Sequence, residues 1–342
     1  RDRSVSRGLG DVYKRQGRIV MLNKLTTVLI CSRAFSLPMT IMSWLVIFTY
    51  SALVAGHIRY GLLALAGICL AHLAANLLDD YFDYKSLIKQ VSFNKKEYLK
   101  NSQKTKCRYL ISGLIRPRDI LILAFIYLAA ASIIGLFFFI KCGIGVVYFA
   151  LIGGIITILY SFMSKIRLSE FAVAVAYGPA LFGGVYYVMT KTYSWDAIIL
   201  SIPSMLVTVT LLYIHTVMDF DFDLNEGHKT VANSFNSQLD SLIVLKWLLI
   251  LAYVTPLLLC IFDILDWQVF IVWLTIPLAV DLYKSMVDFS ANAESIPEHK
   301  WYHFPMENMM NAPSFMTRIY QSRNLMIYYS LFLALAIILA LN

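Results

Sequence analysis

Residues 61–84 read GLLALAGICLAHLAANLLDDYFDY, an apolar run that ends in a group of acidic residues. No Lys, Arg, Asp or Glu interrupts the run between Gly61 and Leu78. As a helix, a run of this length is long enough to cross the hydrocarbon core of a bilayer. The stretch therefore predicts a transmembrane helix that carries carboxylates at one end.

Similar apolar runs recur along the chain, of which 59% is hydrophobic, and the mean hydropathy is +0.68. Membrane-spanning β-strands would alternate polar and apolar residues, and these runs do not. We therefore expect an all-α fold, a polytopic membrane bundle of about nine transmembrane helices. The expected spans are 37–57, 61–79, 119–139, 144–163, 170–190, 196–218, 241–264, 268–290 and 323–341.

The first twenty residues differ from the rest of the chain. They read RDRSVSRGLGDVYKRQGRIV, and Met21 follows them as a natural start. Because the segment is polar and has no apolar stretch of its own, we expect residues 1–20 to be a non-native leader rather than a signal peptide. Residues 21–342 are expected to form a single domain.

The distribution of basic residues predicts the orientation of the bundle. If the N-terminus is cytoplasmic, only Arg59, Lys141 and Lys191 lie on the outer side, as the positive-inside rule requires. The membrane topology then accounts for the excess of basic residues. Because this excess needs no nucleic acid to explain it, we expect no nucleic-acid partner. The acidic groups after the second and sixth spans would both face the cytoplasm, which predicts an active site on the cytoplasmic side of the cell membrane.

Two acid clusters carry the expected chemistry. Asn76, Asp80 and Asp83 are spaced at i, i+4 and i+7, and Asp219 and Asp223 at i and i+4, so each set would share one face of a helix. Crowded carboxylates repel one another unless a cation lies between them. Oxygen ligands suit magnesium, which commonly bridges carboxylates to substrate phosphates. The clusters predict a diphosphate site, from which Asp221 would point away.

These residues resemble the signatures of the UbiA-type intramembrane prenyltransferases, an NDxxD-like motif after the second helix and a DxxxD motif after the sixth. Further matches resemble the branch that prenylates 1,4-dihydroxy-2-naphthoate. They are NLLDDYFDYK at 76–85, SGLI at 112–115 followed by Pro117, YS at 160–161 with Lys165 and Arg167, and GP at 178–179 followed by GVYY at 184–187. The sequence also departs from the pattern. Asp79 stands where Asn is usual, His215 and Met218 stand where Asn and Arg are usual, the downstream Gly and Asp of the first motif are absent from 85–93, and GHKT at 227–230 only approximates GKxTL.

The resemblance implies a Mg²⁺-dependent membrane enzyme that transfers a polyprenyl group from an isoprenyl diphosphate to an aromatic acceptor, with 1,4-dihydroxy-2-naphthoate in menaquinone biosynthesis as the best candidate. It implies that Asp80, Asp83, Asp219 and Asp223 bind metal and are catalytic, and that Asn76 supports the metal site. The residues expected to bind the diphosphate are Arg108, Lys165, Arg167 and Lys229. Those expected to bind the acceptor or stabilise the allylic cation are Arg33, Tyr84 and Tyr160.

Two alternatives stay open at this stage. Another UbiA-type enzyme would use 4-hydroxybenzoate, a chlorin or a glycerol lipid as the acceptor. A cation-coupled transporter would also carry acidic residues in its helices. Transporter sites usually lie near the midplane, whereas these acids are expected at cytoplasmic helix ends, which favours the enzyme.

Overall fold

The computed structural model describes residues 26–54, 56–90, 93–100, 107–226, 229–303 and 313–341. Residues 1–20, expected to be a leader, lie outside this range. In the described residues nine helical segments are long and apolar enough to cross a membrane, which confirms the predicted all-α bundle. No strand occurs among them; one isolated backbone bridge joins Ile166 to Lys229.

Each predicted span corresponds to one of these segments. The first consists of η1 (Ala34–Ser36) with α2 (Leu37–Val54), the fifth of α8 (Ser169–Val175), η2 (Ala176–Ala180) and α9 (Leu181–Thr190), and the eighth of η4 (Trp267–Thr275) with α13 (Ile276–Ala291). The others are single helices: α3 (Ile58–Leu87), α6 (Pro117–Cys142), α7 (Gly145–Met163), α10 (Trp195–Met218), α12 (Gln238–Ile261) and α14 (Ser314–Leu341). Short helices between them are α4 (Lys95–Lys100), α5 (Arg108–Ser112), α11 (Phe220–Glu226), η3 (Ala232–Ser234) and η5 (Trp301–His303).

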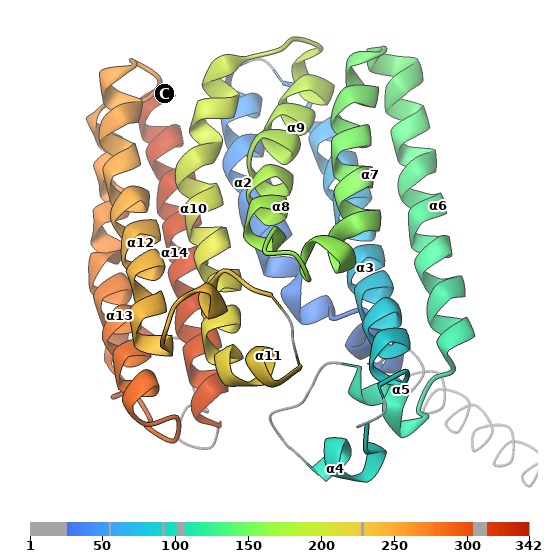
Figure 1. The fold of residues 1–342 in the computed structure, drawn as a ribbon. Helices are drawn as coiled ribbons and strands as arrows, with labels where there is room; N and C mark the ends of the chain where they lie inside the picture. The colour runs from blue at the N-terminus through green and yellow to red at the C-terminus, as the bar shows by residue number, and fades with distance from the viewer. Residues whose placement is uncertain are drawn as a thin grey trace, which may run out of the picture.

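The long helices stand side by side, with α6 and α7 at one edge and α12, α13 and α14 at the other (Figure 1). The short helices α4, α5 and α11 lie beyond one end of the bundle, which is the end where α3 and α10 finish. We call it the acidic end, because Asp79–Asp83 and Asp219–Asp223 lie there.

Burial distinguishes the central helix from the edge helices. In the most apolar window of α10, 72% of residues are buried, compared with 11% for both α6 and α7. Most exposed residues along the middle of α6 and α7 are large and apolar, as expected of surfaces that face lipid tails. The protein is therefore a multi-pass integral membrane protein whose core is built around α10, α2 and α14, which pack on one another.

The fifth span is bent where the sequence has Gly178-Pro179. Proline cannot donate a backbone hydrogen bond, and the helix widens into a π-type turn over Ala176–Ala180. Gly178 also packs tightly, because a Cβ atom there would lie 2.9 Å from Met205 Sδ. The bend brings Tyr177 to a polar contact with α3 described below.

Two expected boundaries were wrong. The second span continues to Leu87 rather than ending at residue 79, so the first acid cluster lies within α3. The ninth begins at Ser314, nine residues before the expected start. Its polar first turns include Arg318, which is fully buried and donates hydrogen bonds to Ser285, Ser295 and Ser314. Hydropathy does not detect a helix whose polar residues are satisfied inside the protein.

Candidate active site

The first acid cluster is built on an unbroken stretch of α3. Helical spacing places Asn76, Asp80 and Asp83 on neighbouring turns, and Asp79 lies beside Asp80. Asp79 and Asp80 are 3% and 1% exposed. Asn76 donates hydrogen bonds to Ser32 O and Ser36 Oγ, both at 3.1 Å. These contacts fix the amide against the segment that precedes α2.

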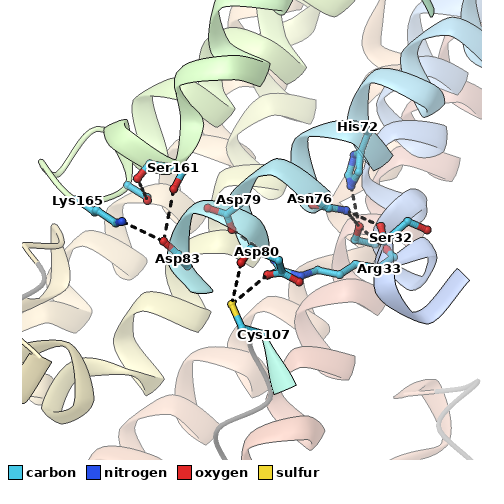
Figure 2. Close-up of polar contacts among 12 residues, drawn as sticks. Ser32, Arg33, His72, Asn76, Asp79, Asp80, Asp83, Cys107, Ser161 and Lys165 are labelled. Atoms are coloured by element: carbon cyan, nitrogen blue, oxygen red, sulfur yellow. Dashed lines mark hydrogen bonds and ion pairs between the residues drawn. The ribbon is translucent and has the colours of Figure 1, made fainter. Parts of the chain in front are cut away.

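Arg33 pairs with this cluster from the start of the first span. Its guanidinium contacts Asp80 Oδ1 directly and lies 3.7 Å from Asp79 Oδ2 (Figure 2). Arg33 has a left-handed backbone conformation, with φ 52°, which is unfavourable for a residue other than glycine. The ion pairs and the turn around Arg33 hold this conformation in place.

Asp80 has two further contacts from the α5 segment. The hydroxyl of Tyr109 donates to Asp80 Oδ2 at 2.7 Å, and the thiol of Cys107 donates to the Asp80 carbonyl at 3.2 Å. A phenol is protonated at neutral pH, and burial raises the pKa of Tyr109 further, so the hydroxyl is the donor in this pair. Both oxygens of Asp80 are thus engaged, one by a cation and one by a neutral donor.

Asp83, one turn nearer the end of α3, contacts the end of α7 and the residues that follow it. Lys165 Nζ lies 3.2 Å from Asp83 Oδ1, and Ser161 Oγ lies 3.4 Å from the same oxygen (Figure 2). Lys165 is 32% exposed. The first cluster therefore has a cation at each of its two ends.

The second acid cluster lies at a break between helices. Asp219 is the C-terminal cap of α10, with φ −89° and ψ 8°, and α11 begins at Phe220. The backbone is interrupted at Asp219, but Asp223 N bonds to Asp219 O at 2.8 Å, which is the bond between residues four apart in a helix. Asp219 and Asp221 are exposed, whereas Asp223 is buried. Phe220, directly after the break, is buried in the core, and α11 then lies at the acidic end of the bundle (Figure 1).

One large cavity of about 1930 Å³ joins the two clusters. Its wall includes Asp79, Asp80 and Asp83 from α3 and Asp219, Asp221 and Asp223 from the α10–α11 junction. Of the other residues predicted from the sequence, the wall contains Arg33, Asn76, Tyr160 and Lys165, and it also contains His215 and Met218. Segments about 140 residues apart in the sequence thus border the same space.

Four predicted residues lie outside this wall. Arg108 donates to the carbonyl of Leu99, and Tyr84 borders a smaller pocket of about 270 Å³. Arg167 and Lys229 are exposed and meet through a backbone bond, Arg167 N to Lys229 O at 3.1 Å. Roles for these four stay predictions, and the geometry favours Lys165 among the basic residues proposed for the diphosphate.

Sequence reasoning missed a polar group deeper in the cavity. His72 lies one turn before Asn76, and its ring nitrogens contact Ser36 Oγ and Thr40 Oγ1, each at 2.7 Å. The Tyr177 hydroxyl also contacts His72 Nδ1. The spacing of His72, Asn76 and Asp80 at four-residue intervals was a usable signal, because it places all three on one face of α3.

The oxygen donors at the cavity fit magnesium in type. No three His, Cys, Asp or Glu side chains in the described ranges are close enough to hold a metal by themselves. A magnesium ion here would need substrate phosphates and water to complete its coordination shell. The donor chemistry is therefore compatible with magnesium at a site that the substrate completes.

From the sequence we expect a helical membrane bundle with two acid clusters on one cavity in an intramembrane prenyltransferase. A comparison with models of protein families gives the same class. The model of the UbiA prenyltransferase family matches residues 36–302. The chain therefore belongs to the UbiA family of membrane prenyltransferases.

Solved structures support the fold at low sequence identity. A structure of digeranylgeranylglyceryl phosphate synthase is 17% identical, with a TM-score of 0.54, and the match covers 93% of this chain and 99% of that one. The apo structure of a UbiA homolog from Aeropyrum pernix K1 is 14% identical, with a TM-score of 0.52, covering 88% and 97%. A comparison with curated proteins gave no significant match.

Proposed function

We propose that this protein transfers a polyprenyl group from an isoprenyl diphosphate to an aromatic acceptor, in the cell membrane and with magnesium. The observation that carries the proposal is the single large cavity bordered by both acid clusters. Carboxylates that border one cavity repel a polyanion such as diphosphate, so they can bind it only when cations lie between them. We also propose that the acidic end faces the cytoplasm, where water-soluble diphosphate is released.

In this proposal, the clusters position the diphosphate at the acidic end of the cavity. Asp80, Asp83, Asp219 and Asp223 would hold the magnesium ions, with Asn76 as a neutral oxygen donor beside them. Bound magnesium would neutralise charge on the diphosphate and make it a better leaving group. Arg33 and Lys165 keep the carboxylates of α3 in place through the ion pairs described above. Their remaining N–H groups can donate to phosphate oxygens.

The reaction then needs protection from water. The allylic C–O bond breaks, the electron pair leaves with the diphosphate, and an electron-rich carbon of the acceptor forms the new bond to C1 of the prenyl group while losing a proton. Water would capture the allylic cation, so the cavity must exclude it. Apart from the carboxylates, much of the cavity wall is apolar. Tyr160 and Phe149 belong to this wall, and their aromatic rings can stabilise positive charge.

For the acceptor, we propose 1,4-dihydroxy-2-naphthoate, which would place the enzyme in menaquinone biosynthesis. The support is the set of motifs at 76–85, 112–115 and 178–187. A glycerol-lipid acceptor is the second candidate, since a solved structure of similar fold is a digeranylgeranylglyceryl phosphate synthase.

The test is to incubate membranes containing the protein with magnesium, a polyprenyl diphosphate and a panel of acceptors, and to measure product masses. The panel contains 1,4-dihydroxy-2-naphthoate, 4-hydroxybenzoate and a prenylated glycerol phosphate. We expect the main product to be a prenylated 1,4-dihydroxynaphthoate, or the prenylated naphthohydroquinone that it gives on losing CO2. Ion flux through proteoliposomes, with no prenylated product from any acceptor, would instead support a transporter.

A further inference from the structure

The ninth span carries two arginines with very different surroundings. Arg318 is fully buried, and its guanidinium donates five hydrogen bonds of 2.7–3.0 Å to Ser285, Ser295 and Ser314. All three guanidinium nitrogens take part, Nε in one bond, Nη1 in three and Nη2 in one, so Arg318 has a structural role. Arg323 lies five residues further along α14, about 140° around the helix, and borders the large cavity.

The donors of Arg323 are poorly satisfied inside the protein. Its Nε is buried without a hydrogen-bond partner, and Nη2 makes one long contact of 3.4 Å to Asn324 Oδ1. The guanidinium lies over the ring of Tyr320, 4.9 Å from the centroid. Within the described ranges it forms no ion pair. Buried polar groups are nearly always satisfied, so an orphaned guanidinium nitrogen on a cavity wall indicates a missing partner.

The missing partner is best explained as an anion. In the described residues, three Lys or Arg side chains border the cavity: Arg33, Lys165 and Arg323. Arg33 and Lys165 are each paired with carboxylates of α3. Arg323 is not, and its planar fork of N–H donors matches a carboxylate or phosphate.

The surroundings of Arg323 favour an aromatic acid over a phosphate. Tyr320 lies beneath the guanidinium, and the other residues that α14 contributes to the cavity wall are Phe315, Met316, Ile319 and Met326. Aromatic rings and thioethers pack well against a flat ring. A phosphate would meet few other donors here, because no second cation lies on this part of the wall in the described chain.

We infer that Arg323 binds the carboxylate of an aromatic acceptor and is the residue that selects an acidic acceptor over a neutral one. The inference rests on the proposed function and specifies its acceptor class. It assigns to Arg323 the acceptor role that the sequence predicted for Arg33, because Arg33 forms ion pairs with Asp79 and Asp80.

The test is equilibrium binding in detergent, without prenyl diphosphate, of 1-hydroxy-2-naphthoate and of 1-hydroxy-2-naphthamide, which lacks the negative charge. The wild-type protein should bind the acid at least about tenfold more tightly than the amide. Arg323→Gln should reduce this preference to less than about threefold, and Arg323→Lys should keep part of it. Because each preference is a ratio within one preparation, partial misfolding does not alter it.

The matched control is Arg118→Gln, which removes the same charge from an exposed position outside the cavity wall, and it should keep the full preference. An unchanged preference in Arg323→Gln, or none in the wild type, would overturn the inference. So would weaker binding of inorganic diphosphate by Arg323→Gln with unchanged naphthoate binding, which would assign Arg323 to the leaving group. Selective naphthoate binding without prenyl transfer would uphold the inference and count against the proposed function.

Discussion

The acid cluster on α3 and the acid cluster at the α10–α11 junction border the same cavity but are built differently. Asp80 is 1% exposed and is held by Arg33, Tyr109 and Cys107. Asp219 is exposed and caps a helix at a point where the chain turns. If both residues bind metal as proposed, the difference predicts that Asp80 serves the fold and the chemistry together, while Asp219 serves the chemistry alone. Mutations can separate these two roles.

The largest effect is expected for Asp80→Asn. Losing a metal ligand should reduce single-turnover prenyl transfer by about 10²–10⁴-fold. Because asparagine cannot neutralise Arg33, the variant should also lose roughly 1–3 kcal/mol of folding free energy. Product formation and the thermal unfolding midpoint, measured on the same preparation, check both effects. An unchanged midpoint would show that the Arg33–Asp80 pair does not stabilise the fold.

Asp219→Asn should show the same loss of turnover without the loss of stability. The side chain is exposed, and removing one of several like charges from a helix end rarely destabilises a protein. We expect turnover to fall by about 10²–10⁴-fold and the thermal midpoint to stay at the wild-type value. A midpoint lowered as far as that of Asp80→Asn would remove the distinction between the two clusters.

A smaller effect is expected for Lys165→Met, which removes the cation paired with Asp83. Loss of one charged contact to the carboxylate and the diphosphate should reduce kcat/KM for prenyl diphosphate by about 10–100-fold. The resemblance to the family implies a similar role for Arg167, but that side chain is exposed and outside the cavity wall. Arg167→Met should therefore cost less than about threefold. Equal losses in the two variants would favour the family pattern over the geometry.

The smallest effect is expected for Asp221→Asn. On a helix, about 200° separates its direction from that of Asp219, although Asp221 also borders the cavity. Turnover should fall less than tenfold, which corresponds to about 1.4 kcal/mol at most. Single-turnover transfer at saturating magnesium, compared directly with Asp219→Asn, is the measurement. A loss as large as that of Asp219→Asn would mean that the α10–α11 junction binds metal through all three carboxylates.

The fold could be predicted from the sequence because apolar runs of membrane-spanning length have one stable solution in lipid, which is the helix. The prediction failed where polar residues are satisfied inside the protein. The start of α14 around Arg318 and the extension of α3 through Asp83 are examples. Neither has the hydropathy of a membrane span, although both are helical.

The carboxylates of the site could be predicted because their helical spacing and repeated placement are visible in the sequence. Their partners could not be predicted. Arg33, Tyr109 and Lys165 reach Asp80 or Asp83 from segments 29 to 82 residues away. The break after Asp219 and the open donors of Arg323 also depend on packing between helices, which no local pattern reports.

The central claim is that the two acid clusters act on one diphosphate through magnesium. The most direct measurement is the affinity of a non-reactive prenyl thiodiphosphate for the wild-type protein, Asp80→Asn, Asp219→Asn and the double variant, with magnesium and with chelator. We expect tight binding only with magnesium. The double variant should bind about as tightly as whichever single variant binds less tightly, because both clusters hold the same ligand. Binding that persists in chelator, or losses that multiply in the double variant, would contradict the claim.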